Sequence, residues 1–295
     1  MSCWRDMNRP DWIKVRVPSA GDAAEMRAVR KVLAEYRLTT VCQGAICPNA
    51  VECWSARTAT FMLLGEVCTR ACRFCAVPTG NPGGALDRDE PRRLADAVRD
   101  LGLRYVVLTS VDRDDLPDGG ASVFAEAIRR IKEEDEAILV EALVPDFGGN
   151  DDALATIARA GADVIGHNIE TVRRITPLVR DPRASYDRSL SVLSRVKELS
   201  PDTITKSSLM LGLGEERDEV LEALRDLRGV GVDIVTLGQY LRPTDAAYPV
   251  ARYVPPEEFD ELREEALVIG FGYAVAGPFV RSSYRAAEAY AAARR

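Results

Sequence analysis

Short apolar runs alternate with longer periodic segments along most of the chain. Runs of about four to eight apolar residues are typical of buried strands, whereas apolar residues at every third or fourth position are typical of helices that bury one face. The predicted strands span residues 61–64, 105–109, 137–144, 163–169, 204–211, 234–239 and 273–276. The predicted helices span residues 22–36, 89–101, 121–133, 151–160, 185–198, 217–227 and 256–269.

This alternation predicts an α/β fold in which helices cover a sheet of parallel strands. Gly161 and Gly270 stand where helices should end, and Pro256 stands where one should begin. Seven predicted strands are too few for a complete eightfold barrel, so we expect an open or partial parallel barrel. In such a barrel the reactive side chains lie on loops at the carboxyl ends of the strands.

Composition and charge narrow the class of protein. A chain of 295 residues can bury a large core without disulfides. Its net charge of −7 does not suit bulk binding of nucleic acid, although a local basic patch would be compatible with it. No apolar run approaches the ~20 residues of a membrane span, and residues 1–20 lack the apolar middle of a signal peptide. We therefore expect a cytoplasmic protein with neither nucleic acid nor membrane as a partner.

Six of the seven cysteines form two groups of three, Cys42, Cys47 and Cys53, then Cys68, Cys72 and Cys75. An odd total in a cytoplasmic setting disfavours disulfides. Structural zinc takes four ligands, and the only histidine, His167, is far away in the sequence. A cubane iron–sulfur cluster held by three thiolates leaves one iron open to a substrate or cofactor. The spacing favours clusters, and zinc remains the alternative.

The second group has the sequence Cys68-Thr-Arg-Ala-Cys72-Arg-Phe74-Cys75 and directly follows a predicted strand. It resembles the cysteine signature of radical S-adenosylmethionine (SAM) enzymes. The first group and the Arg281-Ser-Ser-Tyr-Arg-Ala sequence near the other end of the chain add a resemblance to the lipoyl synthase family. Further resemblance lies in residues 105–115, 143–147, 167–168, 205–207 and 237–240.

This resemblance implies a division of the chain. Residues 59–270 would form the partial (β/α)6-type barrel of radical SAM enzymes. Residues 1–58 would be an N-terminal extension that carries the first three cysteines, and residues 271–295 a C-terminal extension. The C-terminal extension would have to fold back beside residues 42–53, although more than 200 residues separate the two in sequence.

The resemblance also implies two [4Fe–4S] clusters and SAM as cofactors. Cys68, Cys72 and Cys75 would hold the cluster that cleaves SAM to a 5′-deoxyadenosyl radical. Cys42, Cys47 and Cys53 would hold an auxiliary cluster that gives up its sulfides. The tail would supply the fourth ligand of this second cluster, Ser283, with the adjacent Ser282 as the alternative. A hard oxygen donor holds iron less firmly than a thiolate does, which suits a cluster that is taken apart.

The implied activity is insertion of two sulfur atoms, at C6 and C8, into an octanoyl chain on a lysine of a carrier domain. The implied partners are octanoylated lipoyl carrier domains, namely 2-oxoacid dehydrogenase E2 subunits and the glycine cleavage H protein. An electron donor such as ferredoxin or flavodoxin is also implied. Two alternatives remain: another auxiliary-cluster radical SAM sulfurtransferase, and a non-enzymatic module that binds zinc or a cluster.

Six further side chains are predicted to bind SAM: Phe74, Thr109, Ser110, Asn168, Glu170 and Lys206. Asn168 and Glu170 would contact the nucleoside hydroxyls, or else cap the next helix. Thr109 and Ser110 end a predicted strand and would meet the methionyl part.

Other polar residues have simpler interpretations. A lysine inside an apolar strand requires a carboxylate, so Lys206 should pair with SAM or with Glu141. His167 is expected to be a core imidazole with satisfied hydrogen bonds. Three aspartates after the second predicted strand are expected to be solvated or paired with arginines: Asp112, Asp114 and Asp115.

Overall fold

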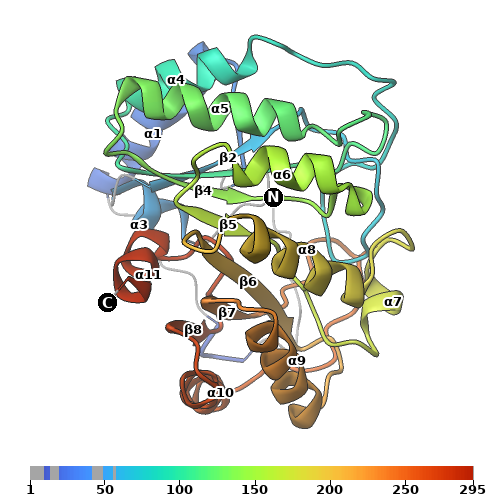
Figure 1. Cartoon of the computed structure of the whole chain (residues 1–295). Helices are drawn as coiled ribbons and strands as arrows, with labels where there is room; N and C mark the ends of the chain where they lie inside the picture. The colour runs from blue at the N-terminus through green and yellow to red at the C-terminus, as the bar shows by residue number, and fades with distance from the viewer. Residues whose placement is uncertain (1–9, 14–19, 42–48, 56–57, 295) are drawn as a thin grey trace.

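The structure is a computed structural model of the chain, and it describes residues 10–13, 20–41, 49–55 and 58–294. Its centre is one eight-stranded sheet whose strands follow each other in chain order (Figure 1). These strands are β1 (Thr39–Thr40), β2 (Thr58–Leu63), β3 (Tyr105–Ser110), β4 (Leu139–Leu143), β5 (Val164–Gly166), β6 (Ile204–Leu211), β7 (Ile234–Gln239) and β8 (Tyr273–Gly277).

The sheet is parallel from β2 to β8, and only β1 runs antiparallel, against β2. All seven predicted strands are present. Within the described chain β8 pairs with β7 alone, so the sheet ends there and does not close on itself. The prediction of an open parallel barrel is confirmed.

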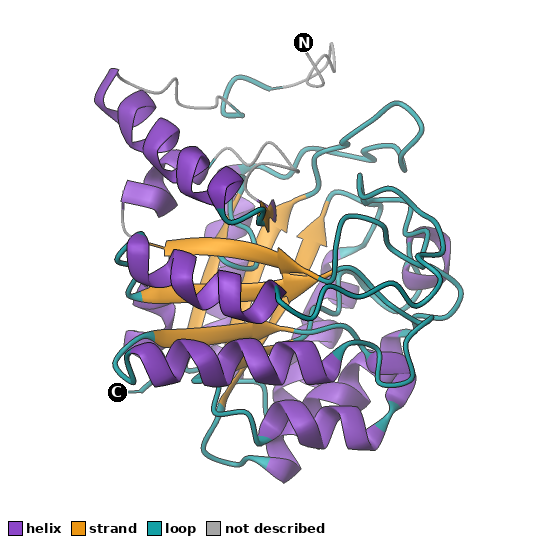
Figure 2. Ribbon diagram, turned by 90° about the horizontal axis from the view of Figure 1, so that it is seen from above, coloured by secondary structure: helices purple, strands orange, loops and turns teal. Residues whose placement is uncertain are grey.

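Most helices pack along the outer face of this sheet, as Figure 2 shows from above. They are α1 (Ala20–Glu35), α3 (Ala50–Ser55), α4 (Glu90–Asp100), α5 (Ala121–Glu134), α6 (Asp151–Ala158), α7 (Thr176–Val179), α8 (Tyr186–Leu199), α9 (Arg217–Gly229), α10 (Pro256–Ile269) and α11 (Ala286–Ala293), with a 3₁₀ turn, η1 (Phe147–Gly149). The seven predicted helices agree with the structure. The prediction omitted five short elements: β1, α3, η1, α7 and α11.

Local chemistry explains where several helices begin and end. The Asn150 side chain accepts hydrogen bonds from the first backbone N–H groups of α6, and Ser185 does the same for α8. Glu216 and Glu219 form a reciprocal capping box at the start of α9. Gly270 ends α10 with φ 108°, a conformation that glycine adopts without a steric penalty.

The two faces of each strand have different neighbours. Val106 and Leu108 of β3 belong to the core beneath the outer helices, whereas Tyr105 and Val107 face the interior and pack near α11. The Tyr105 and Tyr290 rings meet edge to face, with centroids 6.5 Å apart. Since Tyr105 begins its strand, α11 covers the amino ends of the strands, which we call the base of the barrel.

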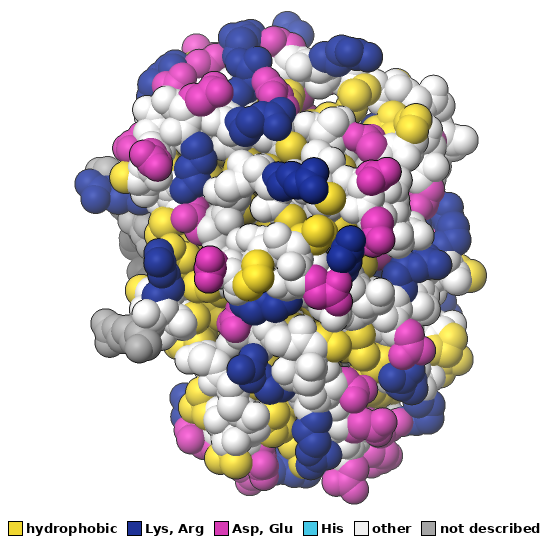
Figure 3. Space-filling view, in the orientation of Figure 1, with side chains coloured by type: hydrophobic (Ala, Val, Ile, Leu, Met, Phe, Trp, Pro, Cys, Tyr) yellow, Lys and Arg dark blue, Asp and Glu magenta, His cyan; other side chains and the backbone are white. Residues whose placement is uncertain are grey.

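The helix surfaces carry both signs of charge. On the face in Figure 3 basic and acidic side chains are interspersed. Some form pairs one helical turn apart, such as Arg92 with Asp96 at 3.0 Å and Arg130 with Glu126 at 2.6 Å. Such exposed pairs each contribute only about 0.3–0.5 kcal/mol. Of the helices that the structure describes, none has the length and apolar character needed to cross a membrane.

Candidate functional site

The second cysteine group lies in the long loop after β2, at the carboxyl ends of the parallel strands. Hydrogen bonds tie this loop to segments that follow other strands. The Thr69 N–H donates to the Asp112 carbonyl at 3.0 Å, and the Arg73 N–H donates to the Val179 carbonyl at 2.7 Å. The Arg73 carbonyl in turn accepts from the Tyr248 N–H at 2.8 Å. These bonds place the loop where the sequence predicted it.

Each sulfur of this group accepts at least one backbone N–H. The Cys68 Sγ accepts from Asp112 at 3.3 Å and from Arg70 at 3.4 Å. The Cys72 Sγ accepts from Asp181 at 3.3 Å, and the Cys75 Sγ accepts from Val77 at 3.4 Å. An anionic acceptor makes the stronger hydrogen bond, so these donors favour thiolates. We call the three cysteines and their loop the upper site.

Burial acts in the opposite direction on these thiols. It raises the pKa of Cys72 to about 12 and also raises the pKa of Cys68 and of Cys75. Thiolates are therefore stable here only beside a strong positive charge, and a coordinated metal deprotonates a thiol outright.

The donor set at the upper site fits an iron–sulfur cluster. It consists of three sulfurs with backbone N–H donors, which are the hydrogen bonds that tune such clusters. Within the described ranges, no three His, Cys, Asp or Glu side chains are grouped so that they could hold a single metal ion. A cluster distributes its thiolates over separate irons and does not require that convergence.

A buried arginine supports the loop from below. The Arg70 side chain pairs with Asp112 at 3.3 Å, Asp114 at 2.8 Å and Asp146 at 2.6 Å. Burial disfavours its charge, but the hydrogen bonds to Asp114 and Asp146 outweigh burial and raise the pKa of Arg70. Burial also disfavours the charged form of Asp112. It raises the pKa of this carboxyl to about 6, although the positive charge of Arg70 opposes the rise.

The three aspartates of the segment after β3 are paired with arginines, as expected. The remaining one, Asp115, pairs with Arg113 at 2.8 Å, and both side chains are buried.

Two anchoring residues were not identified from the sequence. The Asp181 carboxylate accepts from the Ala71 N–H at 2.9 Å, and its hydrogen bond from Arg183 strongly lowers the pKa of Asp181. Asp146 holds Arg70 and also accepts from the Gly148 N–H at 2.9 Å. Asp146 follows a predicted strand, and this position at the carboxyl end of a strand could have identified it as a site residue. Asp181 follows only the unpredicted short helix α7.

The predicted nucleoside contacts lie just beyond β5. Glu170 has φ 71°, a strained value for this residue, and its backbone pairs with β6 through Ser208 and Met210. Burial raises the pKa of Glu170, and a hydrogen bond with the Asn168 side chain opposes this. Neither residue caps the next helix, because the N-cap of α7 is Ile175.

Thr109 and Ser110 end β3 with half-buried side chains. The Ser110 hydroxyl oxygen is buried and has no hydrogen-bond partner among the described residues. Phe74, between two of the upper cysteines, packs against the apolar core formed by β6 and β7.

Two polar residues are satisfied inside the protein. The Lys206 Nζ donates to both oxygens of Glu141, at 2.9 and 3.0 Å, and the Tyr105 hydroxyl donates to the same carboxylate at 2.8 Å. Of the two carboxylates considered for Lys206, Glu141 is thus the one it contacts. The His167 ring nitrogens lie 2.9 Å from the Val144 carbonyl and 2.9 Å from the Ser189 hydroxyl, as expected for a core imidazole.

The first cysteine group is described only in part. Cys53 lies on α3 and packs against the core beneath the outer helices, whereas Cys42 and Cys47 fall outside the described residues. α3 directly precedes β2, and the upper cysteines directly follow it. Since a strand rises about 3.3 Å per residue, the six residues of β2 span about 17 Å. Cys53 and the upper site are therefore on opposite ends of the barrel.

The C-terminal segment runs back to this lower end. The Phe279 carbonyl accepts from the Asn49 side chain at 2.7 Å, and the Ser283 hydroxyl accepts from Thr60 of β2 at 3.1 Å. Arg285 pairs with Glu52, next to Cys53, at 3.3 Å. Figure 1 shows α3 and α11 side by side. We call Cys53, Ser283 and these contacts the basal site.

Gly238 of β7 explains how the C-terminal segment passes so close to the sheet. A Cβ at this position would lie 2.1 Å from the Val280 carbonyl oxygen, so only glycine fits. The returning segment therefore packs backbone against backbone on β7 before it reaches Ser283.

Comparisons with known proteins agree on one family. The Radical SAM superfamily model matches residues 62–227. The chain is 58% identical to the lipoyl synthase of Thermus thermophilus, over 95% of this chain and 86% of the relative. It is 60% identical to the lipoyl synthase of Pyrobaculum arsenaticum, over 95% and 94% of the two chains.

Solved structures show the same fold at low identity. The crystal structure of methylornithine synthase superposes with a TM-score of 0.56 at 15% identity, covering 88% of this chain and 79% of that one. The hydrogenase maturase HydG from Carboxydothermus hydrogenoformans gives 0.55 at 14% identity, covering 92% and 78%.

Proposed function

The chain belongs to the lipoyl synthase family of the radical SAM superfamily, and from that premise we propose a division of labour between its two sites. The upper site would generate the radical, and the basal site would donate sulfur. The product would be a lipoyl group, formed by inserting sulfur at C6 and C8 of an octanoyl chain on a carrier lysine. The cofactors of the family are SAM and two [4Fe–4S] clusters.

At the upper site, Cys68, Cys72 and Cys75 would hold the first cluster. With SAM bound, this cluster supplies a radical able to abstract hydrogen from an unactivated alkyl carbon, which no general base can deprotonate. The protein contributes position and electrostatics. Backbone N–H groups stabilise the thiolates, and Arg70 fixes the loop through its aspartates.

Side chains around the upper site would orient SAM. Asn168 and Glu170 would bind the nucleoside hydroxyls, because they follow β5 and cap no helix. Thr109 and Ser110 would meet the methionyl part, and the unpartnered Ser110 hydroxyl supports this role. Phe74 would pack beside the cofactor. Lys206 would act indirectly, since its ammonium is already paired with Glu141.

At the basal site, Cys42, Cys47 and Cys53 would hold the auxiliary cluster, with Ser283 as its oxygen ligand. The hydrogen bond from Thr60 to Ser283 supports the choice of Ser283 over Ser282. Residues 59–270 would then form most of the catalytic barrel. Residues 1–58 and 271–295 would be extensions that add β1 and β8 to its two edges and meet at its base.

The observations that support this proposal are that Cys53 and the upper cysteines lie on either side of β2, and that Ser283 of the C-terminal segment contacts Thr60 of β2. The octanoylated carrier domains of E2 subunits and of the H protein would be the substrates. Ferredoxin or flavodoxin would supply electrons, in the cytoplasm.

Metal analysis of the anaerobically reconstituted protein, followed by an assay, tests the proposal. We expect about eight iron and eight sulfide per chain, and lipoyl product from an octanoyl-lysyl peptide with SAM and dithionite. Stoichiometric zinc without iron would instead favour a binding module. Release of 5′-deoxyadenosine without any lipoyl product would favour a different sulfurtransferase.

A further inference from the structure

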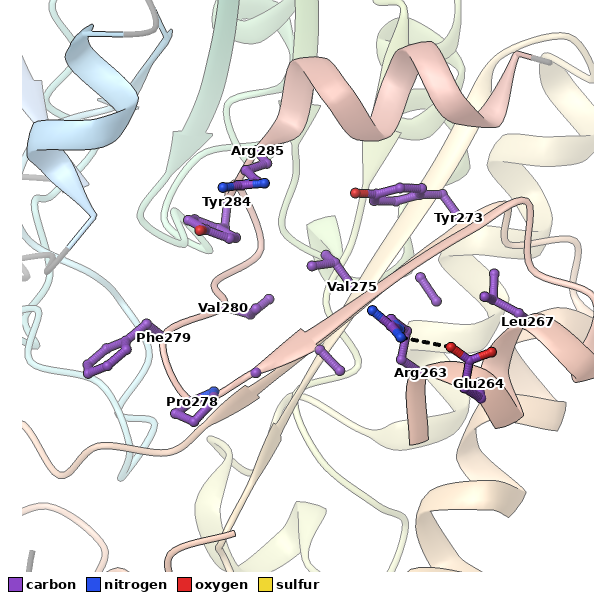
Figure 4. Close-up of a pocket in the computed structure, with 13 residues that line it drawn as sticks. Arg263, Glu264, Leu267, Tyr273, Val275, Pro278, Phe279, Val280, Tyr284 and Arg285 are labelled. Atoms are coloured by element: carbon purple, nitrogen blue, oxygen red, sulfur yellow. Dashed lines mark hydrogen bonds and ion pairs between the residues drawn. The ribbon is translucent and has the colours of Figure 1, made fainter. Parts of the chain in front are cut away.

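Arginines on two parts of the surface differ in how their charge is compensated. A cavity of about 580 Å³ lies along β8, and its Arg263 pairs with Glu264 at 2.7 Å (Figure 4). Beside the upper site, by contrast, two arginines have no carboxylate partner among the described residues: Arg73 and Arg242. Ion pairs therefore leave positive charge uncompensated near the upper cysteines.

Arg73 lies in the cysteine loop itself, between Cys72 and Cys75. Its guanidinium group donates to the Leu178 carbonyl at 3.0 Å and lies 5.0 Å from the centre of the Tyr248 ring. Arg73 is exposed, so its charge meets solvent one residue away from a predicted cluster ligand.

Arg242 lies on the same side of the molecule as Arg73. Its Nε–H donates to the Ala247 carbonyl at 2.9 Å, one residue before Tyr248. Burial raises the pKa of Tyr240 to about 12, and the positive charges of Arg242 and Arg73 both oppose this rise. Since both arginines act on one hydroxyl, their guanidinium groups lie near each other.

An exposed apolar side chain lies beside these charges. Leu178 of α7 is 47% exposed, and its neighbour Pro177 is exposed as well. Figure 1 shows α7 at the outer edge of the molecule. Apolar residues together with arginine are typical of protein interfaces. We call Arg73, Pro177, Leu178 and Arg242 the docking surface.

The chemistry of the docking surface limits the kind of partner. Arginines without ion pairs attract an acidic protein surface and steer its approach. Asp245, on the same loop as Arg242, is exposed and opposes this attraction only in part. The apolar part is small, which suits a brief encounter, since electron-transfer complexes bury less than about 1,200 Å².

The position of the docking surface favours a redox partner. Arg73 directly follows Cys72, which is a predicted ligand of the upper cluster. The rate of electron transfer between two proteins falls steeply with the distance between their redox centres. A carrier that docks here would bring its own redox centre close to the upper cluster.

We propose that the docking surface binds an acidic one-electron carrier, a flavin or iron–sulfur protein, which reduces the upper cluster. One electron would pass from the reduced carrier, which is thereby oxidised, to the oxidised cluster, which is thereby reduced, and no bond forms or breaks. This inference rests on the proposed function, because that function supplies the cluster as the electron acceptor.

Two reductants separate docking from chemistry: reduced flavodoxin, an acidic flavoprotein, and dithionite, a small molecule that needs no docking surface. For reconstituted Leu178→Glu enzyme, half-maximal 5′-deoxyadenosine formation should require about tenfold more flavodoxin, because the new charge repels an acidic partner. The dithionite-driven rate should stay within twofold of wild type. Val268→Glu is the matched control, since Val268 is 83% exposed at the end of α10, and it should change neither value.

A charge series at Arg242 tests the electrostatic part. Arg242→Gln should raise the half-saturating flavodoxin concentration roughly three- to fivefold, because one attractive charge is lost. Arg242→Lys keeps the charge but not the planar guanidinium group, and it should restore the wild-type value. Failure of lysine to restore that value would show that the charge of this residue does not attract the carrier.

The outcomes distinguish this inference from the proposed function. Equal effects of Leu178→Glu and Val268→Glu, or no reduction of wild-type enzyme by flavodoxin, would overturn the docking surface. Parallel loss of the dithionite-driven rate in Leu178→Glu would overturn it too. A raised KM for the octanoylated carrier domain with normal flavodoxin dependence would assign the surface to that domain instead. Wild-type enzyme that forms no 5′-deoxyadenosine with dithionite would overturn the proposed function.

Discussion

The upper and basal sites are built in different ways. The upper site is one continuous loop, and buried groups hold it from several sides: Arg70, Asp146, Asp181 and the backbone donors to each sulfur. The basal site joins two segments that lie about 230 residues apart, through a few contacts that include the exposed pair of Glu52 and Arg285. In the described part of the chain, buried groups hold the upper site, whereas the contacts of the basal site include an exposed ion pair.

This difference matches the chemistry that the proposed function requires. A cluster that cleaves SAM in every cycle must keep its geometry, so a rigid set of ligands is an advantage. An auxiliary cluster that loses its sulfides must be exchanged or rebuilt. Exposed ion pairs contribute little to stability, so the pair of Glu52 and Arg285 by itself holds the C-terminal segment to α3 only weakly.

Removing one cysteine from each group should give the largest effect and the clearest contrast. Cys68→Ala should abolish 5′-deoxyadenosine formation, because the cluster that cleaves SAM loses a ligand. Cys42→Ala should retain SAM cleavage and lose all lipoyl product. Quantifying both products by mass spectrometry checks this, with about four iron remaining in each variant. Identical behaviour of the two variants would refute the division of labour.

Arg70→Met tests the rigidity of the upper site. Removing one member of a buried ionic network costs up to about 3–5 kcal/mol, and here Asp146 would keep only the longer of its ion pairs, with Arg188 at 3.7 Å. Urea unfolding of the apo protein measures this loss. Arg92→Met, which removes exposed pairs on α4, is the control and should cost less than about 1 kcal/mol. Equal losses of unfolding free energy in the two variants would show that Arg70 does not stabilise the upper site in the proposed way.

Ser283→Ala should affect the basal site alone. We expect at least tenfold less lipoyl product with SAM cleavage within twofold of wild type, together with a changed electron paramagnetic resonance signal of the auxiliary cluster. Ser282→Ala is the matched control. Normal product and an unchanged signal in Ser283→Ala would remove this serine from the ligand set, and the reverse pattern would assign Ser282.

Features that depend on the local sequence could be predicted, whereas contacts between distant segments could not. The strands and long helices follow from the period of apolar residues, because each buries one face over several turns or pleats. The short elements α7 and β1 lack enough residues to show a period. The partner of Lys206 could be narrowed to two carboxylates, since a buried ammonium requires one, but the choice depended on the register of β4 and β6.

The basal site was beyond local inference. The contact between Glu52 and Arg285 depends on how the whole sheet curves, and only family resemblance indicated that the C-terminal segment returns. The upper cysteines could be placed because they directly follow a strand. The residues that hold them come from distant loops, and Asp181 gave no recognisable signal.

His167 gives the fold a pH dependence near the upper site. Burial lowers its pKa from 6.5 to about 4, so the folded state holds the ring neutral. The contribution of this neutral ring to the free energy of unfolding is fully present above pH 6.5. About 3 kcal/mol of it is lost as the pH falls from 6.5 toward 4. Asp112, whose pKa burial raises to about 6, acts in the opposite direction over part of this range.

Comparison of His167→Gln with wild type therefore isolates the histidine. Apo-protein unfolding free energies measured between pH 7 and 4 should fall less steeply in the variant. Parallel curves for the two proteins would show that the imidazole does not titrate on unfolding.

The smallest expected effect concerns the pair that closes the basal site. Glu52 and Arg285 are each about half exposed, at 48% and 47%, so solvent screens their attraction. A double-mutant cycle with Glu52→Gln and Arg285→Gln should give a coupling energy below about 1 kcal/mol, measured by urea unfolding of the apo protein. SAM cleavage should remain unchanged in all three variants. A coupling energy above about 2 kcal/mol would mean that the C-terminal segment is firmly fixed to α3, and the two sites would then not differ in rigidity.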